Sequence, residues 1–144
     1  MRSPIQSLTV SYFVHSTEDP VKIQGAAEAA LDTEAPGVSE ELAGHHGNRI
    51  LLVTVHLTGE GAASAFASLR GRLPAEVKRA IFADLESMVD EHSALYLRLD
   101  KQALVAGKLR LGGREIVRVR VKPRPFIVRG GGAEFFRRAL EEGQ

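Results

Sequence analysis

The chain of 144 residues contains no cysteine and no tryptophan, and it has only two tyrosines. Without cysteine it can form neither a disulfide nor a thiolate metal site, and a reducing cytoplasm is the compartment that this composition favours. No apolar run approaches the ~20 residues of a membrane span, and the N-terminus "MRSPIQSLTV" lacks the apolar core of a secretion signal. We therefore expect a cytoplasmic protein with no membrane partner and one domain over residues 1–144.

Signatures of the common enzyme classes are missing as well. The stretches "GEGAAS" and "RGGGAE" contain glycines but lack the Lys-Ser/Thr ending of a phosphate-binding loop. There is no nucleophile elbow, and cysteine catalysis is impossible. A nuclease built from His45, His46 and Asp100 can be imagined, but nothing in their spacing requires it. We expect a protein without catalytic activity, cofactor or metal.

Charge is small in total but unevenly distributed along the chain, whose formal net charge is +1. Residues 1–97 carry 7 Lys and Arg against 13 Asp and Glu, a net of −6. Residues 98–144 carry 12 against 5, a net of +7. Because a concentrated field steers charged partners more than net charge does, the basic C-terminal part suggests a polyanionic partner.

Hydrophobic periodicity predicts both strands and helices. Alternation of period two predicts strands over about 5–14, 50–57 and 93–100, and a hairpin over 107–122 with its turn at Gly112-Gly113. Helical periodicity predicts helices over 21–32, 59–73, 74–92 and 133–142, and Asp100 is placed to cap a further short helical turn. Residues 33–40 indicate a loop. Because each strand has one apolar and one polar face, we predict an α+β fold of two layers, a mainly antiparallel sheet with helices on one face and the other face open.

The stretch "REIVRVRVKPRPF" (114–126) shows this alternation most clearly. Its valines face the predicted core, and Arg118, Arg120 and Lys122 face the other side, with Arg124 continuing the row. We predict that the open face carries Ser7, Thr9, Ser11, Thr54, His56, Tyr96, Arg98, Lys108, Arg110, Arg118, Arg120 and Lys122. Cations spaced ~6.6 Å apart along a strand can follow a phosphate backbone. The alternative is a solvated strand face, or an edge strand that its charge keeps from aggregating.

Three stretches resemble an archaeal family of small predicted RNA-binding proteins that are described as predicted exosome subunits. They are "FVHSTED" (13–19), "AGHHGNRI" (43–50) and "LYLRLDKQALVAGKLRL" (95–111), and the resemblance extends over about residues 5–143. It implies RNA as the partner and an α+β fold like that of the large-subunit ribosomal protein that binds 5S ribosomal RNA. The family usually has proline where this chain has Arg49, which adds a cation.

Two of these motifs contain further candidate contacts. His45 and His46 precede Gly47 and Asn48 in a tight loop, which we interpret as an RNA-contacting loop; the alternative is turn chemistry with side-chain hydrogen bonds. Adjacent histidines alternate in direction and are poorly placed to share a metal ion. We expect Lys101 and Gln102 to project beside the basic face and to contact a phosphate or a base edge.

The sequence therefore predicts a non-catalytic RNA-binding protein. Tyr96 is the one outward aromatic residue that the pattern identifies, so contacts to the phosphates of structured RNA fit better than stacking on single strands. The predicted contacts are His45, His46, Asn48, Arg49, Arg98, Lys101, Gln102, Lys108, Arg110, Arg118, Arg120, Lys122 and Arg124. The alternative function is a protein-interaction module, in a homo-oligomer or with an exosome component, that uses the same basic face.

Overall fold

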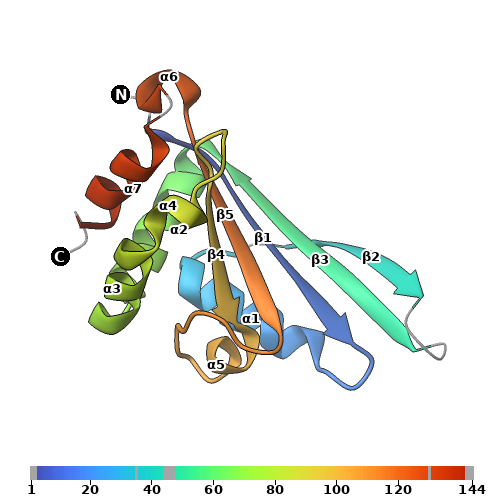
Figure 1. The fold of residues 1–144 in the computed structure, drawn as a ribbon. Helices are drawn as coiled ribbons and strands as arrows, with labels where there is room; N and C mark the ends of the chain where they lie inside the picture. The colour runs from blue at the N-terminus through green and yellow to red at the C-terminus, as the bar shows by residue number, and fades with distance from the viewer. Residues whose placement is uncertain (1–2, 35, 44–47, 130, 142–144) are drawn as a thin grey trace.

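The computed structural model describes residues 3–34, 36–43, 48–129 and 131–141. One antiparallel sheet has the strand order β2-β3-β1-β5-β4. Its strands are β1 (Ile5–His15), β2 (Val38–Ala43), β3 (Arg49–Thr58), β4 (Leu95–Asp100) and β5 (Ile116–Pro123). Figure 1 shows β1, β5 and β4 side by side, the β2–β3 hairpin reaching beyond them, and the start of β1 and the C-terminal helix at the opposite end. The predicted α+β fold with an antiparallel sheet is confirmed.

The helices pack against the sheet and against one another. They are α1 (Pro20–Leu31), α2 (Gly59–Arg72), α3 (Ala75–Ala83), α4 (Leu85–Met88), α5 (Lys101–Val105), α6 (Pro125–Val128) and α7 (Gly132–Glu141). Helix α2 lies against β1 and β3, and α1 packs on α2 and α5. Among the described residues, none of these helices combines the length and the hydrophobicity needed to cross a bilayer.

The core lies between the helices and one face of the sheet, which we call the inner face. On β1 it contains Leu8, Val10, Tyr12 and Val14, and the β5 residues Val117, Val119 and Val121 lie beside Leu95, Leu97 and Leu99 of β4. The helices contribute side chains that include Ile23, Phe66, Leu69, Ile81, Phe136 and Leu140. Full burial of one such side chain is worth about 1.5–3 kcal/mol, so this alternation fixes which face of β1, β4 and β5 turns inward.

Residues 33–40 were predicted to form a loop, but β2 begins at Val38. It pairs with β3 from Val38 opposite Thr54 to Ala43 opposite Arg49. The sequence "VSEELA" shows no alternation of apolar and polar residues, because β2 is an edge strand with little core contact. Pairing with β3 and not hydrophobic burial makes this segment a strand.

The helix predicted over 74–92 is interrupted at Asp84, where α3 ends and α4 begins. Asp84 has φ −129° and ψ 23°, outside the helical region, while Val77, Ile81 and Leu85 all remain buried. Helix α4 ends at Met88, because Val89 is extended and forms a β-bridge with Leu95.

The predicted hairpin over 107–122 is wrong. Strand β5 pairs with β1 on one side and with β4 on the other, so no edge is left for a hairpin partner. Residues 108–112 instead run along the free edge of β4, where the backbone N–H of Asp100 donates to the Arg110 carbonyl at 2.7 Å. Gly112 and Gly113, with φ of +87° and +99°, make the turn that brings the chain back to β5.

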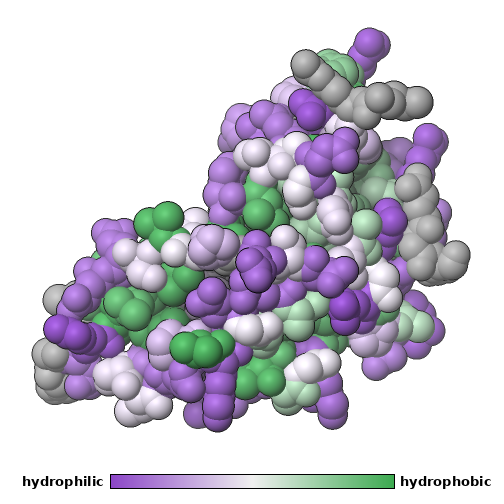
Figure 2. All heavy atoms as spheres, turned by 180° about the vertical axis from the view of Figure 1, so that it is seen from behind, coloured by the Kyte–Doolittle hydropathy of each residue, from purple (hydrophilic) through white to green (hydrophobic). Residues whose placement is uncertain are grey.

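Figure 2 shows the molecule from behind. Hydrophilic side chains cover much of this side, and hydrophobic ones gather toward the end that carries the β2–β3 hairpin. Among the described residues, the two most exposed large hydrophobic side chains, Val38 and Val21, belong to β2 and α1.

Candidate functional site

The face of the sheet opposite the helices, which we call the outer face, brings four of the predicted cations together. The register places Arg118 between Ser11 of β1 and Arg98 of β4. One step along the strands, Arg120 lies between Thr9 and Tyr96, and Lys122 is opposite Ser7. We call Arg98, Arg118, Arg120 and Lys122 the cationic patch. The alternation in the sequence predicted its four members and their common face.

The cationic patch has little internal compensation. Arg98 and Arg118 are directly opposite each other on adjacent strands, an arrangement of like charges that destabilises a sheet. No ion pair joins a member of the patch to a carboxylate in the part of the chain that the structure describes. Arg98 and Arg118 are exposed, so their field reaches the solvent.

Tyr96 and Asp90 organise the β4 side of the patch. The Arg120 guanidinium lies over the Tyr96 ring, 5.9 Å from its centroid. The Asp90 carboxylate accepts hydrogen bonds from the backbone N–H groups of His92 and Ala94, both at 2.9 Å. Burial raises the pKa of Asp90, but these bonds and one from the Tyr96 hydroxyl outweigh it, and the pKa lies below its ordinary value. A fixed, ionised carboxylate therefore lies close to the patch.

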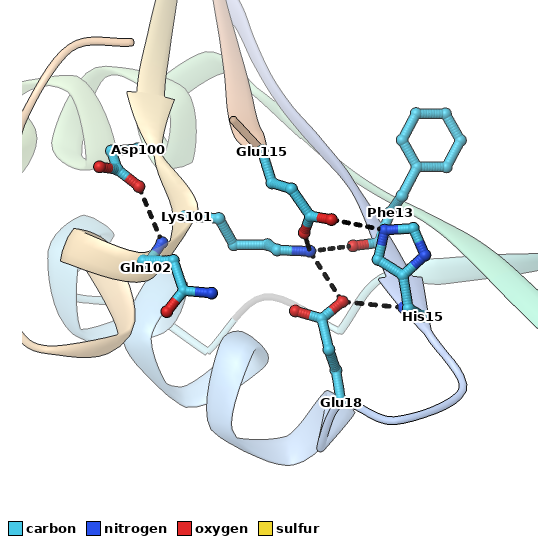
Figure 3. Close-up of polar contacts among 7 residues, drawn as sticks. All are labelled: Phe13, His15, Glu18, Asp100, Lys101, Gln102 and Glu115. Atoms are coloured by element: carbon cyan, nitrogen blue, oxygen red, sulfur yellow. Dashed lines mark hydrogen bonds and ion pairs between the residues drawn. The ribbon is translucent and has the colours of Figure 1, made fainter. Parts of the chain in front are cut away.

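Lys101 is not a surface cation, which corrects the prediction that its side chain projects beside the basic face. Its side chain is 2% exposed, and its Nζ donates to the Phe13 carbonyl at 2.9 Å and to Glu18 Oε1 at 2.8 Å. The third partner is Glu115 Oε2 at 2.5 Å (Figure 3). Since an ammonium group has three donors, Lys101 has none left for a phosphate.

Glu18, Glu115 and His15 surround this ammonium group (Figure 3). His15 Nε2 lies 2.8 Å from Glu115 Oε1, and the backbone N–H of His15 donates to Glu18 Oε1. Burial raises the pKa of Glu18, but the bonds from His15 and Lys101 prevail and lower it. The ligand atoms of His15, Glu18 and Glu115 lie within 4.8 Å of one another, as metal ligands would. The Lys101 ammonium lies between the two carboxylates, so this cluster carries its own cation.

Of the remaining predicted contacts, Lys108, Arg110 and Gln102 lie away from the patch. Lys108 and Arg110 line a cavity on the helix side with residues of α1, because residues 108–111 do not form a strand beside β5. Gln102 is exposed on α5, which packs on α1, and its backbone N–H bonds the capping Asp100 carboxylate. Arg124 follows Pro123, the last residue of β5, and its Nε donates to the Ser3 carbonyl at 2.7 Å.

The loop predicted to contact RNA is described only in part. His45 and His46 lie outside the described residues. Asn48 is exposed, and Arg49 at the start of β3 forms an exposed ion pair with Glu41 at 2.9 Å. Arg49 is opposite Ala43 in the register. Its neighbour Ile50 is in line with Leu52 and Thr54 of the outer face, so Arg49 itself points to the other side of the sheet.

The outer face also has an apolar end that the sequence reasoning missed. Beyond Ser11 and Thr54, β1 and β3 place Phe13 opposite Leu52, and Phe13 is 47% exposed. Phe13 follows Thr9 and Ser11 at alternate positions of β1 and so lies on the same face. The alternation in the sequence was therefore sufficient to find it. The outer face therefore combines cations on β4 and β5 with hydrophobic side chains on β1 and β3.

An open antiparallel sheet with a cationic patch that forms no ion pair within the described residues is a surface suited to nucleic acids. Residues 7–123 match the model of a family described as RNA binding. The chain belongs to this family, as the motifs at 13–19, 43–50 and 95–111 predicted.

Archaeal proteins are similar to the chain over most of its length. It is 32% identical over 127 residues to the RNA-binding protein PAB1135 of Pyrococcus abyssi, a match of 83% of this chain and 82% of that protein. Protein AF2318 of Archaeoglobus fulgidus has a TM-score of 0.77 and 28% identity, with 94% of this chain and 99% of that one covered. Mth689 of Methanothermobacter thermautotrophicus has a TM-score of 0.75 and 25% identity, with coverages of 94% and 98%. The crystal structure of AF2318 and the structure of Mth689 both carry the family name DUF54.

Proposed function

We propose that this protein is a non-catalytic RNA-binding protein whose cationic patch contacts the phosphates of structured RNA. The observation that supports this most directly is the meeting of Arg98, Arg118, Arg120 and Lys122 on one uncovered sheet face without a carboxylate partner among the described residues. The family and the name of the Pyrococcus abyssi relative support RNA as the ligand.

The energetics of phosphate binding suit this surface. Each cation that neutralises a phosphate releases a condensed counterion, and the affinity then depends on the number of contacts and little on sequence. Arginine donates two parallel hydrogen bonds to a phosphate, which makes Arg98 and Arg118 the best-placed members of the patch. The half-buried hydroxyl groups of Thr9 and Ser11 on neighbouring β1 add neutral donors on the same face.

Three finer parts of the proposal reach beyond the patch. We infer that the loop of His45, His46 and Asn48 makes a second RNA contact, with Arg49 as an additional cation. An association with exosome components, and a likeness to the ribosomal protein that binds 5S RNA, remain predictions from the family resemblance. Self-association is the rival function, because the acidic N-terminal part of one copy would complement the cationic patch of another.

A salt series tests the proposal. With four phosphate contacts, the logarithm of the affinity for an RNA hairpin should fall linearly with the logarithm of salt concentration, with a slope of about −3 to −4. Arg98→Gln with Arg118→Gln should flatten this slope by about 2 and weaken binding roughly 10- to 100-fold at 0.1 M salt. Filter binding measures both quantities.

Lys108→Gln with Arg110→Gln is the matched control, because it removes the same charge from the helix side. We expect it to change affinity by no more than about twofold. Equal losses in the two double variants, or an affinity that does not respond to salt, would contradict binding through the cationic patch. A dimer that dissociates with salt and with Arg98→Gln/Arg118→Gln in light scattering would favour the rival function.

A further inference from the structure

A cavity of about 700 Å³ lies beside the cationic patch, where the α3–α4 segment meets the edge of β4. One wall consists of Arg98 and Arg118, and Asp84 and Asp90 lie on another. Met88, Leu111 and the Tyr96 side chain supply apolar and aromatic surface between them. The volume falls within the ~300–1,000 Å³ typical of pockets for small organic ligands.

The charges that line this cavity are separated from one another. Neither arginine forms an ion pair with either aspartate, although all four side chains line the same space. Asp90 is engaged with the backbone N–H groups of His92 and Ala94. The exposed carboxylate of Asp84 has neither a hydrogen bond nor an ion pair within the described part of the chain, so it is available as an acceptor.

An unpaired nucleotide has the complementary groups. Its phosphate is an anion that suits the two guanidinium groups, and its base has a flat face that packs on Tyr96, Met88 and Leu111. The edge of guanine, adenine or cytosine carries an exocyclic amino group, which donates to a carboxylate. Uracil has no amino group and offers only its ring N–H.

We propose that this cavity binds one unpaired nucleotide of the RNA, with a preference for bases that carry an exocyclic amino group, which donates to Asp84. This inference rests on the proposed RNA binding and adds a base-reading site to it. The phosphates of the surrounding helix contact the cationic patch, and the extruded nucleotide enters beside it. Structured RNA with a bulge or a loop is therefore the preferred ligand, rather than a fully paired helix.

Hairpins that differ in one bulged nucleotide test the proposal while the number of phosphates stays constant. Hairpins with a bulged G, A or C should bind about tenfold more tightly than the hairpin with a bulged U. Asp84→Ala removes the acceptor, so it should reduce this difference to within about twofold, and it should change the affinity for the bulged-U hairpin no more than the control variant does. Glu86→Ala is the matched control, because it removes the same charge and acceptor from α4 at a position that does not line the cavity, and it should preserve the difference.

The outcomes separate this inference from the proposed function. Equal affinities for all four hairpins, with the expected salt dependence, would overturn the nucleotide site and leave binding by the cationic patch intact. No binding to any hairpin at low salt would overturn both.

A second measurement reports on the cavity itself. The chain has two methionines, so methyl-labelled methionine gives a simple spectrum in which Met88 can be assigned from Met88→Leu. The Met88 methyl signal should shift when the hairpin with a bulged G is added. An unchanged Met88 signal at saturating RNA would overturn occupation of the cavity.

Discussion

At the scale of single residues, Lys101 shows how a charged side chain in a family motif can have a structural role. Its ammonium group joins the end of β1, the residue Glu18 before α1, and Glu115 before β5. The motifs at 13–19 and 95–111 therefore meet in space at this cluster. Residues of both motifs therefore contribute to holding the fold together at this point.

Replacing Lys101 by Met should destabilise the protein without a direct effect on RNA. The change leaves the carboxylates of Glu18 and Glu115 close together without their cation, and removing one partner of a buried ion pair costs about 3 kcal/mol. For a chain of this size that corresponds to a fall in Tm of roughly 10 °C. Thermal unfolding followed by circular dichroism measures the shift.

Gln102→Met on the same short helix provides the comparison, because Gln102 is exposed and should tolerate the change. At a temperature where both variants are folded, their affinities for an RNA hairpin should equal that of the unchanged protein. A Lys101→Met variant of normal Tm that binds RNA poorly would show that Lys101 contacts RNA after all.

At the scale of the elements, alternation within a strand was predictable and the partners of each strand were not. Arg118, Arg120 and Lys122 share a face with Arg98 because period-two geometry is local, and the sequence displays it directly. Lys108 and Arg110 were misplaced because a hairpin with β5 assumes that a neighbour in sequence is a neighbour in the sheet. Strand β1, which lies more than a hundred residues earlier in the chain, is the partner of β5 at that edge. The sequence of residues 107–122 contains no signal for this pairing.

The buried position of Lys101 was hidden for the same reason. Its three acceptors lie on Phe13, Glu18 and Glu115, which are distant in sequence or belong to another loop. The cavity at Asp84 was likewise unpredictable, because it depends on the break between α3 and α4 and on the docking of that segment at the edge of β4.

The turn between α5 and β5 gives a prediction at this scale. A Cβ on Gly113 would lie 2.8 Å from Cγ of Asp100, whose carboxylate caps α5, and the φ of +99° strains any other residue. Gly113→Ala should therefore lower the free energy of unfolding by the cost of backbone strain and by part of the cap, about 2–4 kcal/mol in total.

Comparison with Gly112→Ala separates the contribution of the α5 cap from that of backbone strain. Gly112 has a similar φ of +87°, but a Cβ there would meet nothing within 4 Å. Urea denaturation should show that Gly113→Ala is the more destabilising change by about 1 kcal/mol, the usual worth of a helix cap. Equal effects would mean that Asp100 moves aside without loss.

At the scale of the whole molecule, RNA binding and stability make opposite demands on the cationic patch. The net charge of +1 makes no strong attraction for a polyanion, so the local arrangement of like charges has to supply the field. The same arrangement sets Arg98 directly opposite Arg118, at a cost in free energy to the sheet. A surface that was optimal for stability alone would place a carboxylate at one of these two positions.

Without RNA, the Arg118→Thr variant should consequently be more stable than the unchanged protein. With RNA bound, it should be the less stable of the two. Relief of the Arg98–Arg118 repulsion is worth a few tenths of a kcal/mol, up to about 1. Lys122→Thr, opposite Ser7, controls for the higher strand propensity of threonine and should gain less. RNA at a hundred times its Kd stabilises the folded state by about 2.7 kcal/mol, and the same RNA concentration should stabilise Arg118→Thr much less. Thermal unfolding with and without RNA should therefore reverse the order of the two proteins, because the unneutralised charge that weakens the free sheet is the charge that the phosphates of the RNA neutralise.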